Sequence, residues 1–304
     1  MQCIYALIQS KDDSLAKQEK FLKVSIENTY SLYLLWLSLF VELHQRATDQ
    51  IDLASKKYLD SEETGFPDEK KFTKNKLLLQ LSQSQSLKEE LANRKLDNWY
   101  LNEEYVKLIY KEIIANDIYK LYMKADNASY ESDKQVIIDL FKEVIAPNDK
   151  IYEYFEDDKL TWIDDIPIVN TFIVRLFKKT KEKQKTDYFT PKLLKDQEDM
   201  DFANQLLSKT LLKNEALEKE IEGKTPNWDK DRIADVDAIL LKMAICELLH
   251  FSSIPERVTI NEYLEIAKEY STPKSSIFIN GILDKLTKEY KVEGKLNKIG
   301  RGLL

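Results

Sequence analysis

The chain has 304 residues, of which 43% are hydrophobic and 33% are charged. This composition excludes a disordered chain and predicts a packed core, with a length typical of two domains. The net charge of −7 counts against a protein that coats nucleic acid without specificity, although it leaves room for a local basic surface.

Turn residues are scarce along the whole chain, with six glycines and seven prolines. Strand-rich folds need such residues at short intervals, so we predict an all-α architecture. In the first half, apolar residues recur at helical spacing over 1–9, 15–59, 76–96, 102–124 and 132–145. The polar segment 60–76 is a predicted loop.

The longest apolar run is residues 30–41, which is too short to span a bilayer. The first residues, MQCIYALIQS, lack the basic start of a signal peptide. We therefore interpret the run as a buried helix and expect a soluble, cytoplasmic protein that does not enter a membrane.

Two charge blocks precede the last third of the chain. Residues 153–165 are acidic, and 175–185 are basic; the basic block could contact phosphate, or it could be a solvated helix end. Pro191 opens a new region, which places the predicted domain boundary near 185–190. The predicted regions are an N-terminal helical region (1–187), a C-terminal helical bundle (188–290) and a basic tail (291–304).

The last third shows sharper helical patterns, over 198–220 and 232–250 and then from Thr259, which together with Glu262 has the spacing of a capping box. The helix 232–250 is apolar on nearly every side, which is typical of the centre of a bundle. Glu247 interrupts it and requires a hydrogen-bond or cationic partner.

The pair Asn280-Gly281 is a strong signal for a β-hairpin turn, yet the residues around it repeat at helical spacing as far as Tyr290. Thr272 and Pro273 supply an N-cap and a first helical residue. We therefore predict a helix that passes through the pair. A glycine at its centre is explained by the close approach of a neighbouring helix, which we favour, or of a ligand's backbone.

Catalytic patterns are nearly absent from this sequence. His44 and His250 lie in apolar helical contexts, without the neighbours of a metal site or a nucleophilic triad. Cys3 and Cys246 read as reduced, buried thiols. We expect no cofactor, no metal, no small-molecule substrate and no enzymatic activity.

Three stretches carry a resemblance to a known family: 235-DVDAILLKMAICEL-248, 254-IPERVTINEYLEIAKEYSTPKSSIFINGILDK-285 and, more loosely, 198-EDMDFANQLLSKTLLKN-214. Their order resembles the NusB family of transcription antitermination factors, over about 93 residues. The opening 2-QCIYAL-7 is similar to the first helix of that family.

The resemblance implies a NusB-like helical bundle and a non-catalytic adaptor. Such an adaptor pairs with the ribosomal protein that doubles as elongation factor NusE, binds boxA-type RNA and joins a complex that lets RNA polymerase read through terminators on rRNA operons. The RNA contacts that the resemblance implies are Gln2, Tyr5, Lys274, Ser275 and Phe278. Single-stranded RNA is read by stacking, hydrogen bonds and a few phosphate contacts, and a helix N-terminus at Lys274 and Ser275 favours a phosphate.

The implied contacts with NusE are Asp237 and Glu247. An alternative is a helical interaction scaffold that binds a NusE-like protein but has lost RNA binding. The acidic composition favours it, as does the absence of the arginine-rich segment that precedes the first helix in the family. An rRNA cytosine methyltransferase would carry a further domain after the bundle, and only 14 residues follow it, so we expect no such domain.

Overall fold

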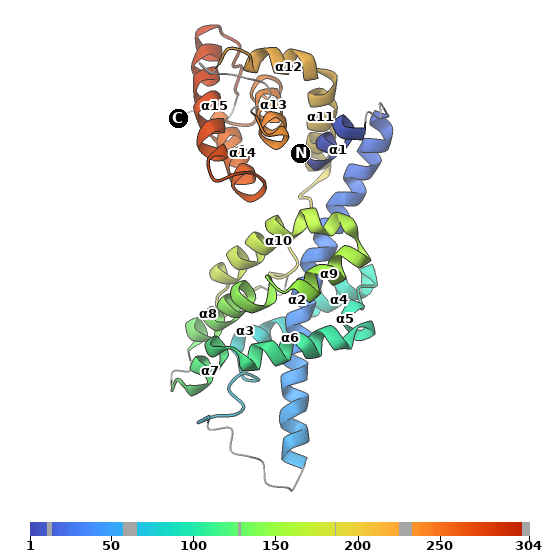
Figure 1. Cartoon of the computed structure of the whole chain (residues 1–304), viewed down its shortest axis with the longest axis vertical. Helices are drawn as coiled ribbons and strands as arrows, with labels where there is room; N and C mark the ends of the chain where they lie inside the picture. The colour runs from blue at the N-terminus through green and yellow to red at the C-terminus, as the bar shows by residue number, and fades with distance from the viewer. Residues whose placement is uncertain (11–13, 57–65, 127–128, 186, 225–232, 300–304) are drawn as a thin grey trace. The chain divides into compact units, whose positions relative to one another are not determined.

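A computed structural model describes residues 1–10, 14–56, 66–126, 129–185, 187–224 and 233–299. Every regular element within these residues is helical, which confirms the all-α prediction (Figure 1). The elements are, in chain order, α1 (Gln2–Ser10), α2 (Leu15–Lys56), α3 (Lys76–Gln83), α4 (Gln85–Arg94), α5 (Asn98–Leu101), α6 (Glu103–Ala115), α7 (Asp117–Lys124), α8 (Tyr130–Leu140), the π-helical turn η1 (Phe141–Ile145), α9 (Asp149–Asp158), α10 (Leu160–Lys179), α11 (Gln197–Leu212), α12 (Asn214–Ile221), α13 (Asp235–His250), α14 (Glu256–Tyr270) and α15 (Ser275–Val292). Among the described helices, none combines the length and apolarity needed to cross a bilayer.

The chain forms two compact units. The central unit is Ile26–Leu193, and the terminal unit joins Met1–Ser25 to Leu194–Leu304. The second boundary lies just after the predicted one near 185–190. The beginning of the chain differs from the predicted region 1–187, because α1 packs against α11 and α13 and buries Cys3 in the core of the terminal unit.

The core of the central unit is built around the apolar stretch of α2. Leu32, Leu34 and Leu35 are fully buried there, and so is Trp36, whose ring meets Phe141 edge-on at 5.3 Å between centroids. Aromatic pairs in this geometry add to the free energy gained from burial alone. The structure thus confirms that the apolar run is a buried helix.

Two predicted helices of the central unit are each divided by a capping residue. Ser84 separates α3 from α4, and its hydroxyl accepts a hydrogen bond from the Leu87 amide. Asn116 separates α6 from α7 in the same way, by accepting from the amide of Ile118. Short polar side chains compete for backbone amides and begin new helices, which periodicity alone does not reveal.

A polar cluster ties α3, α7 and α8 together inside the central unit. Asn75 is fully buried. Its side-chain oxygen accepts hydrogen bonds from the backbone amides of Leu77 and Leu78. Its side-chain NH2 group donates to the Asp133 backbone oxygen at 2.9 Å. The Asp133 carboxylate accepts a hydrogen bond from the Tyr122 hydroxyl at 2.7 Å. These bonds satisfy the buried polar groups and so fix how the three helices meet.

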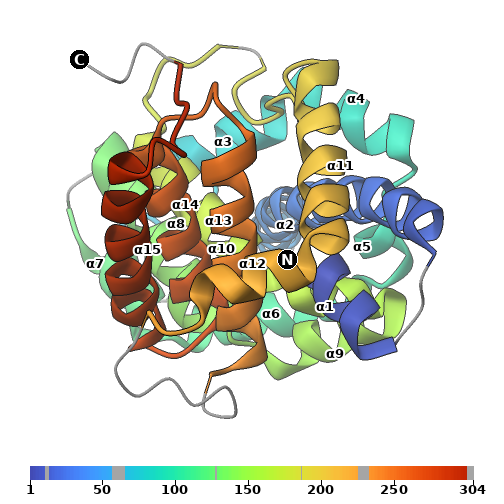
Figure 2. The same ribbon diagram turned by 90° about the horizontal axis from the view of Figure 1, so that it is seen from above.

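In the terminal unit, α13 is the central helix, as predicted from its apolar surface. It packs against α1, α11, α12, α14 and α15 (Figure 2). Its residues from Ile239 to Leu241 and from Met243 to Leu248 are buried.

Two helix starts differ from their predicted positions. Thr259 and Glu262 do not begin a helix, because α14 starts at Glu256 with Pro255 as its N-cap, and Thr259 is buried inside it. Proline at this junction needs no backbone donor, so it can set the start without a side-chain cap. The last helix, α15, begins at Ser275 after a turn, slightly later than the predicted start at Pro273.

The described part of the predicted basic tail is folded onto the end of α13. The Lys298 ammonium donates to the backbone oxygens of Glu247 and Phe251, at 3.0 and 2.9 Å, and the Ile299 amide donates to Ser252. Both carbonyls also accept a backbone amide, from Phe251 and Ile254 respectively, so the lysine adds a charged donor at the end of the helix. This part of the tail therefore packs onto the terminal unit, and the Lys298 ammonium binds backbone oxygens within that unit.

Candidate functional site

The helix α15 runs without a break through Asn280-Gly281, which confirms the helical prediction for that pair. The predicted reason for the glycine, the close approach of a neighbouring helix, is wrong. Gly281 is exposed, and a Cβ atom built on it meets no heavy atom within 4 Å. Among the described residues, no neighbouring helix therefore requires a glycine at this position.

One face of α15 gathers four residues at spacings of three and four. Lys274 and Gly281 are exposed, Ile277 is 75% exposed, and Phe278 is half-buried with its inner side against the core. Residues at this spacing share one side of a helix. We call these four residues the α15 face. The sequence reasoning found Lys274 and Phe278 but missed Ile277, which the helical spacing from Lys274 would have included.

Ser275 lies under this face and not on it. Its side chain is 3% exposed, and its hydroxyl donates to the carboxylate of Asp237 on α13 at 2.7 Å. The Ser271 hydroxyl donates to the same carboxylate at 2.6 Å, and Thr272 lies within hydrogen-bond distance of Ser275. A helix N-terminus favours a negative charge, and here the protein supplies its own through Asp237.

Gln2 and Tyr5 lie on α1, on another side of the same central helix. Tyr5 is 40% exposed, and Gln2 is half-buried. Both α1, which carries Tyr5, and α15, which carries Phe278, pack against α13.

Glu247 is inside the terminal unit, only 5% exposed. The hydroxyl of Tyr263 donates to its carboxylate at 3.1 Å, which supplies the hydrogen-bond partner that the sequence required. Burial raises the pKa of the Glu247 carboxyl above its ordinary value, whereas the hydrogen bond from Tyr263 and the nearby Lys298 ammonium act in the opposite direction.

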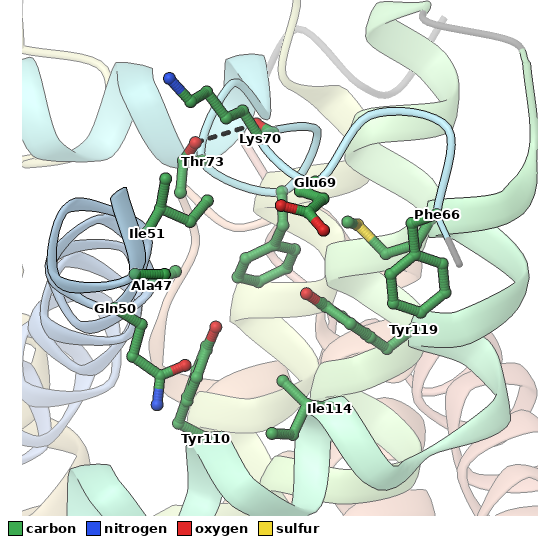
Figure 3. A pocket seen from close by; sticks show the side chains of 13 residues that line it. Ala47, Gln50, Ile51, Phe66, Glu69, Lys70, Thr73, Tyr110, Ile114 and Tyr119 are labelled. Atoms are coloured by element: carbon green, nitrogen blue, oxygen red, sulfur yellow. Dashed lines mark hydrogen bonds between the residues drawn. The ribbon is translucent and has the colours of Figure 1, made fainter. Parts of the chain in front are cut away.

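A cavity of about 470 Å³ lies in the central unit, between α2, α6, α7 and the segment before α3 (Figure 3). Rings of Phe66, Phe72, Tyr110 and Tyr119 form much of its wall. Burial raises the pKa of the Tyr119 hydroxyl above its ordinary value.

Both ring nitrogens of His44 lie within hydrogen-bond distance of groups in the central unit. One ring nitrogen lies 2.8 Å from the backbone oxygen of Thr73, and the other lies 3.0 Å from the Ser82 hydroxyl. Within the described residues, no group of three or more His, Cys, Asp or Glu side chains is arranged to hold a metal ion.

Comparison with known proteins finds one family. Residues 168–288 match the model of the NusB family. The transcription antitermination protein NusB of Salinibacter ruber is 45% identical over 104 residues, which cover 34% of this chain and 65% of that protein. The protein of the same name from Chloroherpeton thalassium is 41% identical over 104 residues, or 34% of this chain and 49% of that protein.

A solved structure of T. maritima NusB is 30% identical and covers 37% of this chain and 81% of its own, with a TM-score of 0.31. The chain thus spans about half to two thirds of the length of the curated relatives that it matches. Most of the central unit lies before the matched residues.

Proposed function

Because residues 168–288 of this chain form a domain of the NusB family, we propose that the protein is a non-catalytic transcription antitermination adaptor. It binds boxA-type RNA together with a NusE-like ribosomal protein and joins the RNA polymerase complex that reads through terminators. The observation that carries this proposal is the 45% identity over 104 residues with a transcription antitermination protein.

The RNA strand is proposed to lie along the α15 face. Phe278 offers a partly exposed ring for stacking, and Lys274 offers a cation for phosphate. The open surface at Gly281 allows a strand to approach the helix backbone. Gln2 and Tyr5 on α1 are proposed as further contacts of the same strand.

Ser275 and Asp237 are proposed to act from below this surface. Their hydrogen bond joins the start of α15 to α13, so it sets the position of Lys274 and Phe278. The NusE-like partner is proposed to meet the terminal unit at the same junction. Asp237 and Glu247, which are both buried, shape that surface through the helices that they hold.

The test is the binding of labelled RNA, measured by anisotropy, with and without NusE. We expect a boxA-type RNA to bind weakly to the protein alone and more tightly with NusE, whereas a scrambled RNA gains little. Phe278→Ala should weaken boxA binding about tenfold, in line with one lost stacking contact. The matched control is Val292→Ala, at the far end of α15 and 90% exposed. Equal binding of boxA and scrambled RNA under both conditions would overturn the proposal.

A second candidate function is a scaffold that binds the NusE-like protein but not RNA. The burial of Ser275 favours it, since this hydroxyl is directed at Asp237 and not at solvent. Calorimetric titration of NusE without RNA distinguishes the two. The scaffold predicts full NusE affinity that boxA RNA does not change, whereas the adaptor predicts tighter NusE binding once RNA is present.

A further inference from the structure

The end of α10 and the residues that follow it carry a dense row of cations. Five lysines are all exposed, and we call them the lysine segment: Lys178, Lys179, Lys181, Lys183 and Lys185. The chain as a whole has a net charge of −7, so this concentration runs against its average composition. The segment belongs to the central unit, far along the chain from α15.

Carboxylates neutralise only part of the lysine segment, because Lys183 alone acts on the carboxylate of Glu182 from within it among the described residues. The one acidic residue inside it is Glu182, whose carboxylate is bound by the Lys76 ammonium from α3 at 2.6 Å. Among the described residues, none of the five lysines has an ion pair with a carboxylate. Like charges along one segment repel one another, and a bound anion relieves that repulsion.

The backbone under the lysines is anchored at its first part by α8. The Lys134 ammonium is buried and lies 3.4 Å from the backbone oxygens of Lys178 and Thr180. The Thr180 hydroxyl donates to the backbone oxygen of Leu176 at 2.8 Å. These bonds hold the carbonyls inward at the point where α10 ends.

The next part of the segment is anchored by α3. The Gln80 amide donates to the backbone oxygens of Lys181 and Glu182, at 3.0 and 2.8 Å, and its own oxygen accepts from Tyr130. The backbone from Lys178 to Glu182 is therefore held in place by side chains of two other helices.

The dipole of α10 accounts for only part of this charge. Cations in the last turn of a helix are favoured, which explains Lys178 and Lys179. The carbonyls at that end already have the Lys134 ammonium beside them. Lys181, Lys183 and Lys185 lie beyond the helix, where the effect of the dipole has decayed.

We propose that the lysine segment binds the phosphate backbone of single-stranded RNA, as a contact in addition to the α15 face. This inference rests on the proposed function, because it assigns the same class of ligand a separate contact on the central unit. Lysines act on phosphates as flexible point charges, so the segment adds affinity without reading bases. A membrane fits less well, because Leu176 and Phe177, the apolar residues directly before the lysines, are buried.

The experiment measures RNA affinity against salt concentration for the full chain. The variant changes all five lysines of the segment to Gln. The matched control changes five other exposed lysines of the central unit to Gln: Lys70, Lys88, Lys111, Lys124 and Lys142. The probe is a scrambled single-stranded RNA of about 20 nucleotides, long enough to exceed the site of a typical binding domain.

The slope of log affinity against log salt should fall by about 0.7 for each lysine that contacts a phosphate, and the affinity at low salt by at least about tenfold. The control should keep the wild-type slope. All five lysines are exposed, so the melting temperature of the segment variant should stay close to that of the wild type, which separates lost binding from lost folding. Equal slopes for the segment variant and the control would overturn the inference.

A parallel series with boxA RNA separates this inference from the proposed function. If boxA and scrambled RNA bind alike while the segment variant still loses slope, the proposed function fails and the lysine segment remains an RNA contact. If boxA preference persists but the slope is unchanged, only the inference fails. Competition by polyglutamate as strong as that by RNA would point to an acidic protein and overturn it as well.

Discussion

The carboxylate of Asp237 on α13 accepts a hydrogen bond from the Ser275 hydroxyl at 2.7 Å, at the residue where α15 begins. The bond joins the central helix of the terminal unit to the helix that carries the α15 face. Both residues are buried, so this contact acts within the unit and determines where the exposed face lies.

We expect Asp237→Ala to destabilise the terminal unit by about 2–4 kcal/mol, because two hydroxyls lose a charged acceptor and a buried cavity forms. Urea unfolding, followed by far-ultraviolet circular dichroism, measures this loss of stability. Asp284→Ala, at an exposed position of α15, is the control and should change stability by less than about 0.5 kcal/mol. An Asp237 variant as stable as this control would contradict the role that we assign to the hydrogen bond.

Gly281→Ala should have opposite effects on stability and on RNA binding. Nothing lies within 4 Å of the new methyl group, so the helix gains about 1 kcal/mol from the better propensity of alanine. The proposed RNA strand, however, loses its close approach to the backbone, and boxA affinity should fall. Thermal unfolding and RNA anisotropy measure the two effects. A more stable variant with undiminished boxA affinity would remove Gly281 from the proposed contact.

Asp165 on α10 should make the central unit more stable in acid. Burial raises the pKa of its carboxyl from 3.8 to about 6, against a smaller opposite effect of the hydrogen bond from Thr29. The folded state thus holds the proton more tightly than the unfolded chain. Its stabilising contribution is complete below about pH 4 and is lost as the pH rises through 6.

It follows that Asp165→Asn should raise the free energy of unfolding at pH 7.5 by about 2 kcal/mol, seen as a higher melting temperature, and should have little effect at pH 4. The control is Asp157→Asn, on the exposed end of α9. If Asp165→Asn gave the same increase at both pH values, the effect would not come from the ionisation of this carboxyl.

Asn75→Ala should destabilise the central unit more than a simple helix cap does. Asn75 caps α3 through two amides and also donates to Asp133, so we expect a loss of about 2–4 kcal/mol. Asn116→Ala removes the cap on the Ile118 amide and should cost about 1 kcal/mol. Chemical denaturation of both variants ranks them, and the reverse order would show that the buried cluster is not cooperative.

Lys298→Ala should loosen the end of α13. Its ammonium donates to the backbone oxygens of Glu247 and Phe251, which would lose a charged donor at a cost of about 1–3 kcal/mol. Hydrogen exchange should then become faster at the C-terminal turn of α13. The control is Lys288→Ala, at an exposed position of α15, and it should leave that exchange unchanged.

Local sequence signals determined much of this fold. Apolar spacing predicted the buried stretch of α2 and the unbroken course of α15, because a helix is selected by contacts three and four residues apart. The same spacing predicted α13 as the central helix. Residue order also indicated the NusB-like segment, and the match over residues 168–288 confirms it.

Only the tertiary structure decided which distant residues meet. Periodicity gave no sign that α1 joins the terminal unit, since its partners on α11 and α13 lie about two hundred residues away. In the sequence, Asp237 does not differ from an aspartate on the surface. In the structure it is buried, and its carboxylate accepts a hydrogen bond from Ser275 at the start of α15. Gly281 could have served a helix contact or an open surface, and the placement of the described helices shows that none of them covers it. Burial and hydrogen bonding depend on the whole packed unit, whereas helix formation depends on the nearest turns of the chain.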